Sequence, residues 1–178
     1  MKKDMKILTA FFSHKGENYF GGRIVYINKG NTAKVAEKLH ALVGGDMYEI
    51  RSASPYPETY KETVAAAVAE LSAGIRPELA VPVPDVSEYD AVILAYPNWC
   101  GTAPMAVRTF LESADFSGKR ILPVCTHEGS GAGRSEADIS ASAPGAVVAR
   151  PLAVVGSEAA HSDELLVTYL KERGVLGV

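Results

Sequence analysis

The 178-residue chain has little of several features that would direct an interpretation of its function. It has only two cysteines, Cys100 and Cys125, which show neither metal-ligand spacing nor a disulfide framework. We expect both to be buried structural thiols. The longest apolar run near the start, residues 7–12, is too short for a membrane span or a signal-peptide core. We therefore expect a cytoplasmic protein with no membrane partner.

Strong charge is also missing. The chain has 18 Lys and Arg against 21 Asp and Glu, a net charge of −3, and no basic cluster interleaved with aromatic residues. Nucleic acid is therefore not expected as a partner. The 47% of hydrophobic and 22% of charged residues are ordinary for a globular protein. The length predicts a single domain, residues 1–178, and we find no repeats or linkers.

What the chain does have is a regular alternation of apolar strands and amphipathic helices. Strands are predicted at residues 6–13, 46–51, 89–96, 120–125 and 147–155. Helices are predicted at 32–43, at 59–73, after Pro104, around 134–140 and at 162–173. This alternation predicts an α/β fold, a three-layer doubly wound sheet of five parallel strands in the order 2-1-3-4-5. In the second helix the positions expected to be buried are Tyr60, Val64, Ala67, Val68 and Leu71.

Two segments depart from this simple pattern. Pro123 lies inside the fourth predicted strand, where it cannot donate a ladder hydrogen bond, so we expect a bulge there. Residues 14–30 form an insert after the first strand. Aromatic and β-branched residues lie on both sides of Gly21 and Gly22, which indicates a small hairpin.

Trp99, the only tryptophan, directly follows the third predicted strand. Pro97 and Gly101 flank it and prevent the strand from continuing. Open parallel sheets bind their ligands at the carboxyl ends of the strands. A planar ligand would explain why a large indole is kept on an exposed turn. The alternative is a tryptophan that only covers the end of the sheet.

Two other loops are predicted at the same edge. Gly30, Asn31 and Thr32 open the first helix, where unpaired amides attract phosphate, although an ordinary helix cap is the alternative. The glycine-rich residues 126–133 follow the fourth strand and allow close approach to a ligand, or else form a mobile surface loop. The loops after strands one, three and four meet at the switch point of the predicted sheet. Their combination favours one shared ligand site.

Three motifs stand out together: Ser13 with residues 30–32, residues 96–104 and residues 125–131. These motifs, and the order of the elements over nearly the whole chain, resemble the flavodoxin-like FMN-binding proteins. The resemblance implies FMN as the cofactor, with its phosphate in the first loop and Trp99 stacked on its isoalloxazine ring. The third loop would border the ring and its pyrimidine end. The cofactor-binding residues it implies are Ser13, Lys15, Gly30, Asn31, Thr32, Tyr96, Pro97, Asn98, Trp99, Cys100, Gly101, Thr126, His127, Glu128, Gly129, Ser130 and Gly131.

The resemblance also implies electron transfer with an unidentified redox partner, and no catalytic residue or metal is required. The chain departs from the family pattern in two ways. The insert separates Ser13 from Gly30, which bears on which residues of the first loop contact the phosphate. The charge of −3 is small for a low-potential carrier, which weakens the interpretation as a pure electron carrier. The alternative is an FMN-dependent NAD(P)H:quinone or flavin reductase, in which Tyr19, Phe20 and Tyr26 of the insert would line a substrate pocket.

Other classes fit less well. A signalling receiver domain needs acidic residues after the first strand and an aspartate after the third, where this chain has Ser13 and Pro97-Asn98. A dinucleotide-binding Rossmann domain needs a G-x-G-x-x-G motif that residues 30–32 do not match. A flavin-free interaction module is left open. The histidines outside the three loops, His14, His40 and His161, are expected to be surface or packing residues.

Overall fold

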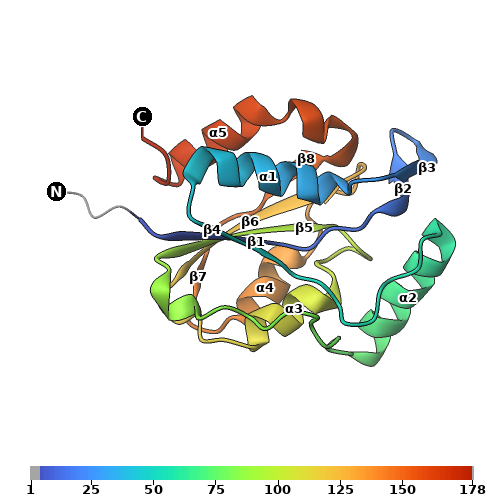
Figure 1. Cartoon of the computed structure of the whole chain (residues 1–178), viewed down its shortest axis with the longest axis horizontal. Coiled ribbons are helices and arrows are strands. Elements are labelled where there is room, and N and C mark those ends of the chain that lie inside the picture. Colours follow the sequence, from blue (N-terminus) through green and yellow to red (C-terminus); the bar gives the residue numbers. More distant parts are fainter. Residues whose placement is uncertain (1–4, 178) are drawn as a thin grey trace.

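The computed structural model describes residues 5–177 and is built around a parallel sheet (Figure 1). Its strands are β1 (Ile7–Phe11), β4 (Asp46–Glu49), β5 (Ala91–Pro97), β6 (Arg120–His127), β7 (Val147–Val148) and β8 (Leu152–Val155). The order is β4-β1-β5-β6-β7. Strand β8 also pairs with β6, further along β6 than the part that pairs with β7. All these pairings are parallel. The predicted order 2-1-3-4-5 is confirmed, with β7 and β8 together taking the place of the fifth strand.

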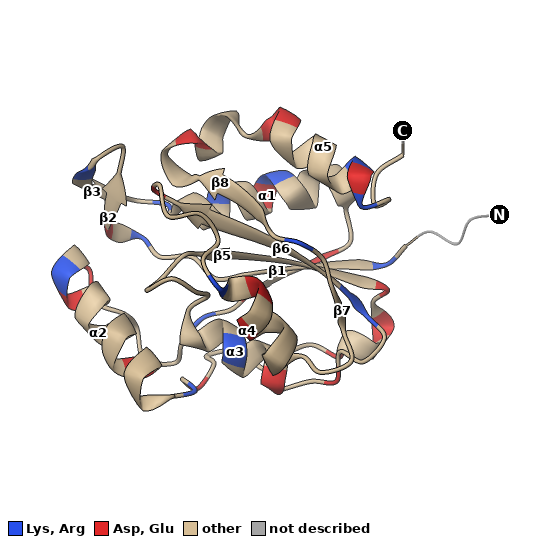
Figure 2. Cartoon of the chain, turned by 180° about the vertical axis from the view of Figure 1, so that it is seen from behind, with Lys and Arg blue, Asp and Glu red and all other residues tan. Residues whose placement is uncertain are grey.

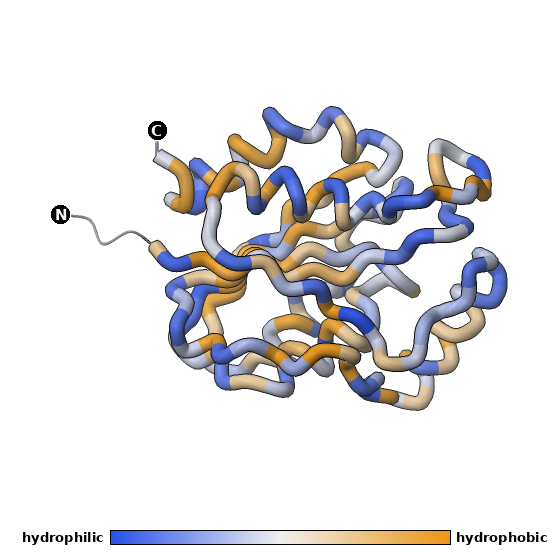
Figure 3. The backbone as a smooth tube through the Cα atoms, viewed as in Figure 1, coloured by the Kyte–Doolittle hydropathy of each residue, from blue (hydrophilic) through white to orange (hydrophobic). Residues whose placement is uncertain are grey.

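Helices cover both faces of the sheet and complete the three predicted layers. They are α1 (Asn31–Val43) and α5 (Asp163–Glu172) on one face and α3 (Met105–Glu112) and α4 (Ser135–Ser142) on the other, with short 3-10 turns η1 (Val86–Glu88) and η2 (Gly156–His161). Alternate residues of β5 enter the two cores: Ile93 packs with α1 and α5, and Leu94 with α3. Figure 3 shows the apolar residues concentrated in these central strands. Within residues 5–177, no helix has the length and apolar character needed to cross a membrane.

The fifth strand is interrupted opposite Pro123. The expected bulge in β6 is wrong, because Pro123 stays in register with Leu94 of β5. Instead β7 pairs with the start of β6 and β8 with its second half, and both registers leave Pro123 out. The Tyr169 hydroxyl lies 3.1 Å from the Pro123 carbonyl oxygen and 3.2 Å from that of Arg150. The Tyr169 hydroxyl thus offers a hydrogen bond to backbone carbonyls at the place where the proline interrupts the hydrogen bonds between strands.

The insert forms the predicted hairpin, from β2 (Gly16–Phe20) and β3 (Arg23–Ile27), which pair with each other and not with the main sheet. Gly21 and Gly22 have φ angles of 59° and 87°, positive at both positions as a type I′ turn requires. Glu17 fastens the base of the hairpin. Its N–H donates to the Glu58 carbonyl at 2.8 Å, and its carboxylate accepts the Tyr60 N–H at 2.8 Å.

Helix α2 (Tyr60–Ala73) packs differently from the prediction. Val64 and Val68, expected in the core, are 39% and 47% exposed, and the buried residues of the helix are Thr63 and Ala67. In Figure 1 the helix stands at the end of the sheet near the hairpin, and not on a face. The expectation is confirmed for Ala67, which is buried, but Val64 and Val68 on the same apolar side do not enter the core.

Candidate functional site

A cavity of about 350 Å³ lies at the carboxyl edge of the sheet, and the structure brings all three predicted loops to it. A second wall comes from the hairpin and α2. The loop residues that line the cavity are Ser13, His14, Asn31, Thr32, Pro97, Asn98, Trp99, Cys100, Thr126, His127, Glu128 and Ser130. The other lining residues are Glu17, Asn18, Tyr19, Tyr60, Thr63, Val64, Ala67 and Gly156, none of which the sequence motifs had indicated as cofactor contacts.

In the first loop, the chain after β1 lies directly against the start of α1. A Cβ on Gly30 would overlap Ser13 Oγ and would lie 2.6 Å from the His14 carbonyl oxygen. Ser13 Oγ accepts the Ala33 N–H at 3.0 Å, and no side-chain cap is provided by Gly30 itself. The first turn of α1 therefore meets the cavity with its positive dipole end, an arrangement that attracts an anion.

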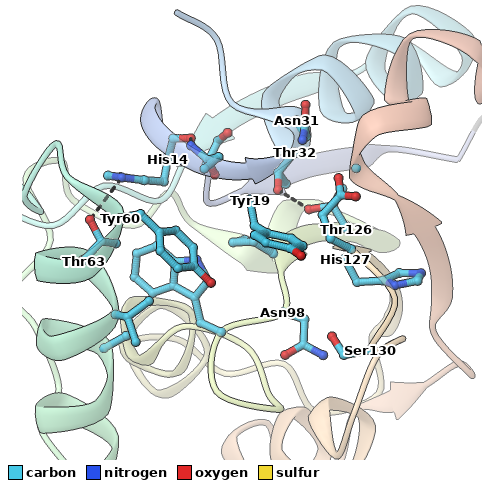
Figure 4. A pocket seen from close by; sticks show the side chains of 18 of the residues that line it. His14, Tyr19, Asn31, Thr32, Tyr60, Thr63, Asn98, Thr126, His127 and Ser130 are labelled. Carbon is cyan, nitrogen blue, oxygen red and sulfur yellow. Dashed lines mark hydrogen bonds between the residues drawn. The ribbon is translucent and has the colours of Figure 1, made fainter. Parts of the chain in front are cut away.

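A hydroxyl pair connects the first loop to the third. Thr32 Oγ1 and Thr126 Oγ1 lie 2.7 Å apart in a buried position, and Figure 4 shows this bond at the cavity beside Asn31. Both threonines belong to the predicted site, although they are far apart in the sequence. Their contact holds the amino end of α1 close to the end of β6.

Trp99 lies on a two-residue turn with an unusual backbone. Its N–H donates to the Thr102 carbonyl at 2.8 Å, and the Thr102 N–H donates back at 3.2 Å. Cys100 and Gly101 between them have φ angles of 56° and 81°. Unlike Gly101, Cys100 has a side chain, so this left-handed backbone conformation costs roughly 1–2 kcal/mol at Cys100. Such backbone strain is typical of functional sites.

Three aromatic rings surround the half-buried indole of Trp99. The ring centroids of Phe12 and Tyr56 both lie 5.0 Å away, and that of His14 lies 5.8 Å away, all with edge-to-face geometry. The Tyr56 hydroxyl in turn donates to Glu70 Oε2 at 2.7 Å. These contacts hold the indole in one orientation beside the cavity.

The second and third loops form one hydrogen-bonded unit. Asn98 Nδ2 donates to the Gly131 carbonyl at 2.7 Å, while Asn98 Oδ1 accepts the Gly101 N–H at 2.9 Å. His127 Nδ1 accepts the N–H groups of Gly129 and Gly131 at 2.9 and 3.0 Å. Nδ1 therefore carries the lone pair, and in the neutral ring the proton lies on Nε2.

Glu128 connects the third loop to two distant segments. Its Oε1 accepts the Ser157 N–H at 2.6 Å, and its Oε2 lies 3.2 Å from the Ser157 hydroxyl and 3.3 Å from the Gly21 N–H. A Cβ on the neighbouring Gly156 would lie 2.8 Å from Asn31 Nδ2 and 3.0 Å from Glu128 Oε1. This carboxylate thus lies next to the first loop and holds the tip of the hairpin.

Some predicted residues lie elsewhere. Lys15 is exposed and does not line the cavity, and Gly30, Gly101, Gly129 and Gly131 support the loops without lining it. Tyr96 is completely buried in the core, with its hydroxyl 2.8 Å from Ser135 Oγ, and burial raises its pKa. The side chain of Tyr96 thus faces away from the cavity, although its strand leads to it.

The two cysteines differ, so the expectation of two buried thiols is wrong for one of them. Cys125 is buried, and burial raises the pKa of its thiol to about 12. Cys100 is exposed on the Trp99 turn.

The second wall brings together residues that are distant in the sequence. His14, expected to be a surface or packing residue, lines the cavity with its Nε2 3.4 Å from Thr63 Oγ1, and burial lowers its pKa. The Tyr19 and Tyr60 rings lie with centroids 6.3 Å apart at an angle of 39°, and Figure 4 shows both at the cavity. Two features of the sequence could have predicted this wall: the apolar side of α2 and the aromatic residues of the insert.

An ion-pair cluster around Asp138 contacts Thr102, the last residue of the Trp99 turn. Asp138 Oδ2 accepts from the Thr102 hydroxyl at 2.6 Å, from Arg108 at 2.6 Å and from Arg134 Nε at 3.1 Å. Burial opposes the charged carboxylate, but these hydrogen bonds and the arginine charges outweigh it and hold the pKa of Asp138 below its ordinary value. The cluster joins α3 and α4 to the residue that closes the turn.

Replacing Asp138 with asparagine is expected to lower the free energy of unfolding by about 2 kcal/mol at neutral pH, because Arg108 and Arg134 lose their counter-ion. The lowered pKa means that this stabilisation is complete above the unfolded pKa and is lost as pH falls through the folded one. Urea denaturation of both proteins at about pH 7 and about pH 3 measures it, and the difference should shrink at the acidic pH.

The control for this prediction is Asp163→Asn, which breaks a solvent-exposed ion pair with Lys38 and should have a smaller effect. An Asp138→Asn difference of equal size at both pH values would contradict the assigned role of the carboxylate.

Comparison with known proteins agrees with this geometry. The family model for flavodoxin matches residues 23–169. The chain belongs to the flavodoxin family. The family and the fold that the sequence motifs indicated are thereby confirmed. A search of curated proteins finds no match.

Solved structures show which proteins this flavodoxin-family chain is similar to. A candidate flavoprotein from Bacteroides uniformis ATCC 8492 is 27% identical, with a TM-score of 0.74 over 95% of this chain and 99% of that one. A second, from Bacteroides eggerthii DSM 20697, is 26% identical, with a TM-score of 0.68 over 92% and 98%. A flavoprotein from Lactobacillus acidophilus NCFM, solved in complex with FMN, shares the fold at 18% identity, with a TM-score of 0.61 over 88% and 97%.

Proposed function

We propose that this flavodoxin-family protein binds FMN in the cavity and transfers electrons through it. The observation that carries the proposal is one cavity at the switch point of the sheet, with the amino terminus of α1 and an oriented indole beside it. Its volume of about 350 Å³ lies within the range of small-molecule sites. FMN is also the cofactor bound by the structural relative from Lactobacillus acidophilus.

The first loop would hold the phosphate. Ser13, Asn31 and Thr32 offer side-chain hydrogen bonds beside the first amides of α1, and all three line the cavity. The described lining residues include no Lys or Arg, so amides, hydroxyls and the helix dipole would supply the binding energy. Gly30 makes this possible because a side chain there would fill the space between α1 and the Ser13 loop.

The second and third loops would hold the ring. Trp99, Asn98 and His127 line the cavity and belong to loops that are hydrogen bonded to each other through Asn98. When bound, FMN supplies one- and two-electron transfer, while the protein positions the ring and tunes its potential. The hydrogen bonds within and between these loops would hold the ring in one position.

The test is FMN titration of the purified protein, followed by the visible flavin absorption and by calorimetry. We expect stoichiometric binding with an altered flavin spectrum. A colourless protein that ignores added FMN would contradict the proposal and support the flavin-free interaction module.

A second candidate is an FMN-dependent NAD(P)H:quinone or flavin reductase, and one observation favours it. The hairpin and α2 add a wall with Tyr19 and Tyr60 that lies outside the three loops proposed to hold FMN. Steady-state oxidation of NADH or NADPH with a quinone by the FMN-loaded protein would support the reductase. A carrier would need a separate reductase and should accept single electrons in a reductive titration.

Replacing Trp99 with alanine is expected to weaken FMN binding about tenfold and to shift its redox potentials, because the ring loses an aromatic contact. Titration calorimetry and spectroelectrochemistry measure the two effects. Trp99→Phe, which keeps a ring on the same turn, should lose less. An alanine variant with unchanged affinity and spectrum would place Trp99 outside the FMN site.

A further inference from the structure

The two edges of the hairpin differ in what lies beside them. On the β2 edge the Glu17 N–H donates to the Glu58 carbonyl at 2.8 Å, so this N–H points away from β3. Glu17 is paired with Tyr26, and in an antiparallel ladder both residues of such a pair direct their N–H and C=O groups outward. The backbone groups of Tyr26 therefore point away from β2. Those of Ile24, two residues earlier on the same strand, point the same way.

The outer edge of β3 is exposed and apolar. Ile24 and Tyr26 are each 54% exposed, and within residues 5–177 no other strand or backbone group bonds to this edge. In Figure 1 and Figure 2, β3 lies at the outer rim of the molecule, with β2 between it and α2. Proteins commonly protect such an edge with lysine, proline, a bulge or a covering loop, but β3 carries a single charged residue, Arg23, at its first position. An edge of this kind can pair with another strand.

The sequence of β3 is complementary to itself in one antiparallel register. When two copies meet about a two-fold axis at Val25, Ile24 of each copy faces Tyr26 of the other, and the outward backbone groups of both residues bond across the axis. A β-branched side chain opposite an aromatic one is a favourable cross-strand pair. Arg23 then lies opposite Ile27 of the second copy, so no like charges face each other directly. A shift by two residues would leave only one of these bonded pairs within β3, which makes this register the preferred one.

We propose that the outer edge of β3 is a dimer interface, at which a second copy of this chain adds its own β3 and extends one antiparallel sheet through both hairpins. An isolated two-stranded hairpin is marginally stable in water, whereas more strands with an apolar face are stable. That face exists, because Tyr19, Ile24 and Tyr26 lie on one side of the hairpin. A strand of five residues buries less than a standard interface of about 1,600 Å², so the dimer should depend on protein concentration. The interface goes beyond the proposed function and does not require bound FMN.

The experiment measures the mass of the purified protein over a concentration series by analytical ultracentrifugation, with and without FMN. We expect a monomer–dimer equilibrium in both cases. Ile24→Lys and Tyr26→Glu should each weaken dimerisation about tenfold, because the axis places the new charge in two cross-strand pairs at once. A mixture of the two variants brings the new lysine opposite the new glutamate in one pair, so the mixture should dimerise more strongly than either variant alone.

Leu165→Lys is the matched control for the added charge, because Leu165 is an exposed apolar residue on α5, far from β3 in the sequence and on another element. It should leave the dimer unchanged. Circular dichroism shows that each variant is folded.

Val25→Cys tests the register directly. Val25 faces its own counterpart across the axis in a pair with Cβ atoms about 4.5–5.5 Å apart, close to the separation that a disulfide needs. Arg23→Cys is the matched control on the same face of the strand, because the two copies of residue 23 would lie more than about 13 Å apart. Mild oxidation should link two copies of the first variant and not of the second. Mass spectrometry identifies the linked residues, since Cys100 is also exposed.

Three results would each overturn the inference. The first is a protein that stays monomeric over the whole series, which would leave the β3 edge to a strand of another protein. The second is a dimer that Ile24→Lys and Tyr26→Glu do not weaken, and the third is a dimer that Val25→Cys does not link. FMN titration of the same proteins is a separate measurement, and a failure to bind FMN contradicts the proposed function but not this interface.

Discussion

Gly30→Ala is expected to lower FMN affinity on the order of a hundredfold, because several hydrogen bonds to a charged phosphate are lost together. The new Cβ would overlap Ser13 Oγ and lie 2.6 Å from the His14 carbonyl oxygen, so the Ser13 loop must move away from the start of α1. The backbone itself tolerates alanine, since Gly30 has φ −61°. FMN titration by calorimetry measures the loss.

Two further variants show whether this loss reflects the site or a general disturbance of α1. Gly44→Ala changes the glycine at the other end of the helix, where φ is 65° and no atom lies within 4 Å of the added Cβ. It should cost stability, by roughly 2 kcal/mol, because φ 65° with ψ −149° is a conformation that only glycine adopts freely, but it should leave FMN affinity unchanged. Ser13→Ala removes one donor without a clash and should weaken FMN about tenfold. A Gly30→Ala protein that is folded by circular dichroism and binds FMN normally would remove the first loop from the phosphate site.

Gly133→Ala is expected to have the largest effect on stability, lowering the free energy of unfolding by about 3 kcal/mol. Its φ of +55° is costly for alanine, and the new Cβ would overlap the Gly101 carbonyl oxygen and lie 2.7 Å from the carbonyl carbon. That carbonyl accepts the Arg134 N–H at 2.9 Å, so the second loop would be pushed away from the start of α4. Urea denaturation measures the loss, and FMN affinity should fall with it.

Gly131→Ala is the matched control for this prediction. Gly131 has a similar positive φ of +66°, but no atom lies within 4 Å of the added Cβ. This replacement should therefore lower the free energy of unfolding only by the cost of placing alanine at positive φ, roughly 1 kcal/mol. Equal losses in the two variants would mean that the contact between Gly133 and the Gly101 carbonyl contributes nothing to stability.

Much of the fold could be predicted from local patterns. The alternation of strands and helices predicted the sheet order, and Gly21 and Gly22 predicted the hairpin turn, because glycine is the residue that adopts positive φ without cost. The three loops could be placed at one edge because the parallel strands that lead to them all end on the same side of the sheet. The effect of Pro123 was placed in the wrong strand, since sequence shows the missing N–H but not which neighbour accommodates it.

The candidate site could be predicted only in part. The motifs identified loops that line the cavity, yet they included Tyr96, whose strand leads there while its side chain enters the core. They included Glu128, but they could not show that it lies next to the first loop and bonds to Gly21 in the distant insert. The period of α2 showed an apolar side but could not distinguish a side that faces a core from one that faces a cavity.

The order of the elements, the turn chemistry and the family of this protein could be recognised from local patterns, because they depend on residue types at short, regular spacings. The contacts of His14 with Thr63, of Tyr19 with Tyr60 and of Glu128 with the hairpin became visible only in the folded chain. These contacts join segments with no shared periodicity. Their geometry follows only once long-range packing has brought the segments to the same edge of the sheet.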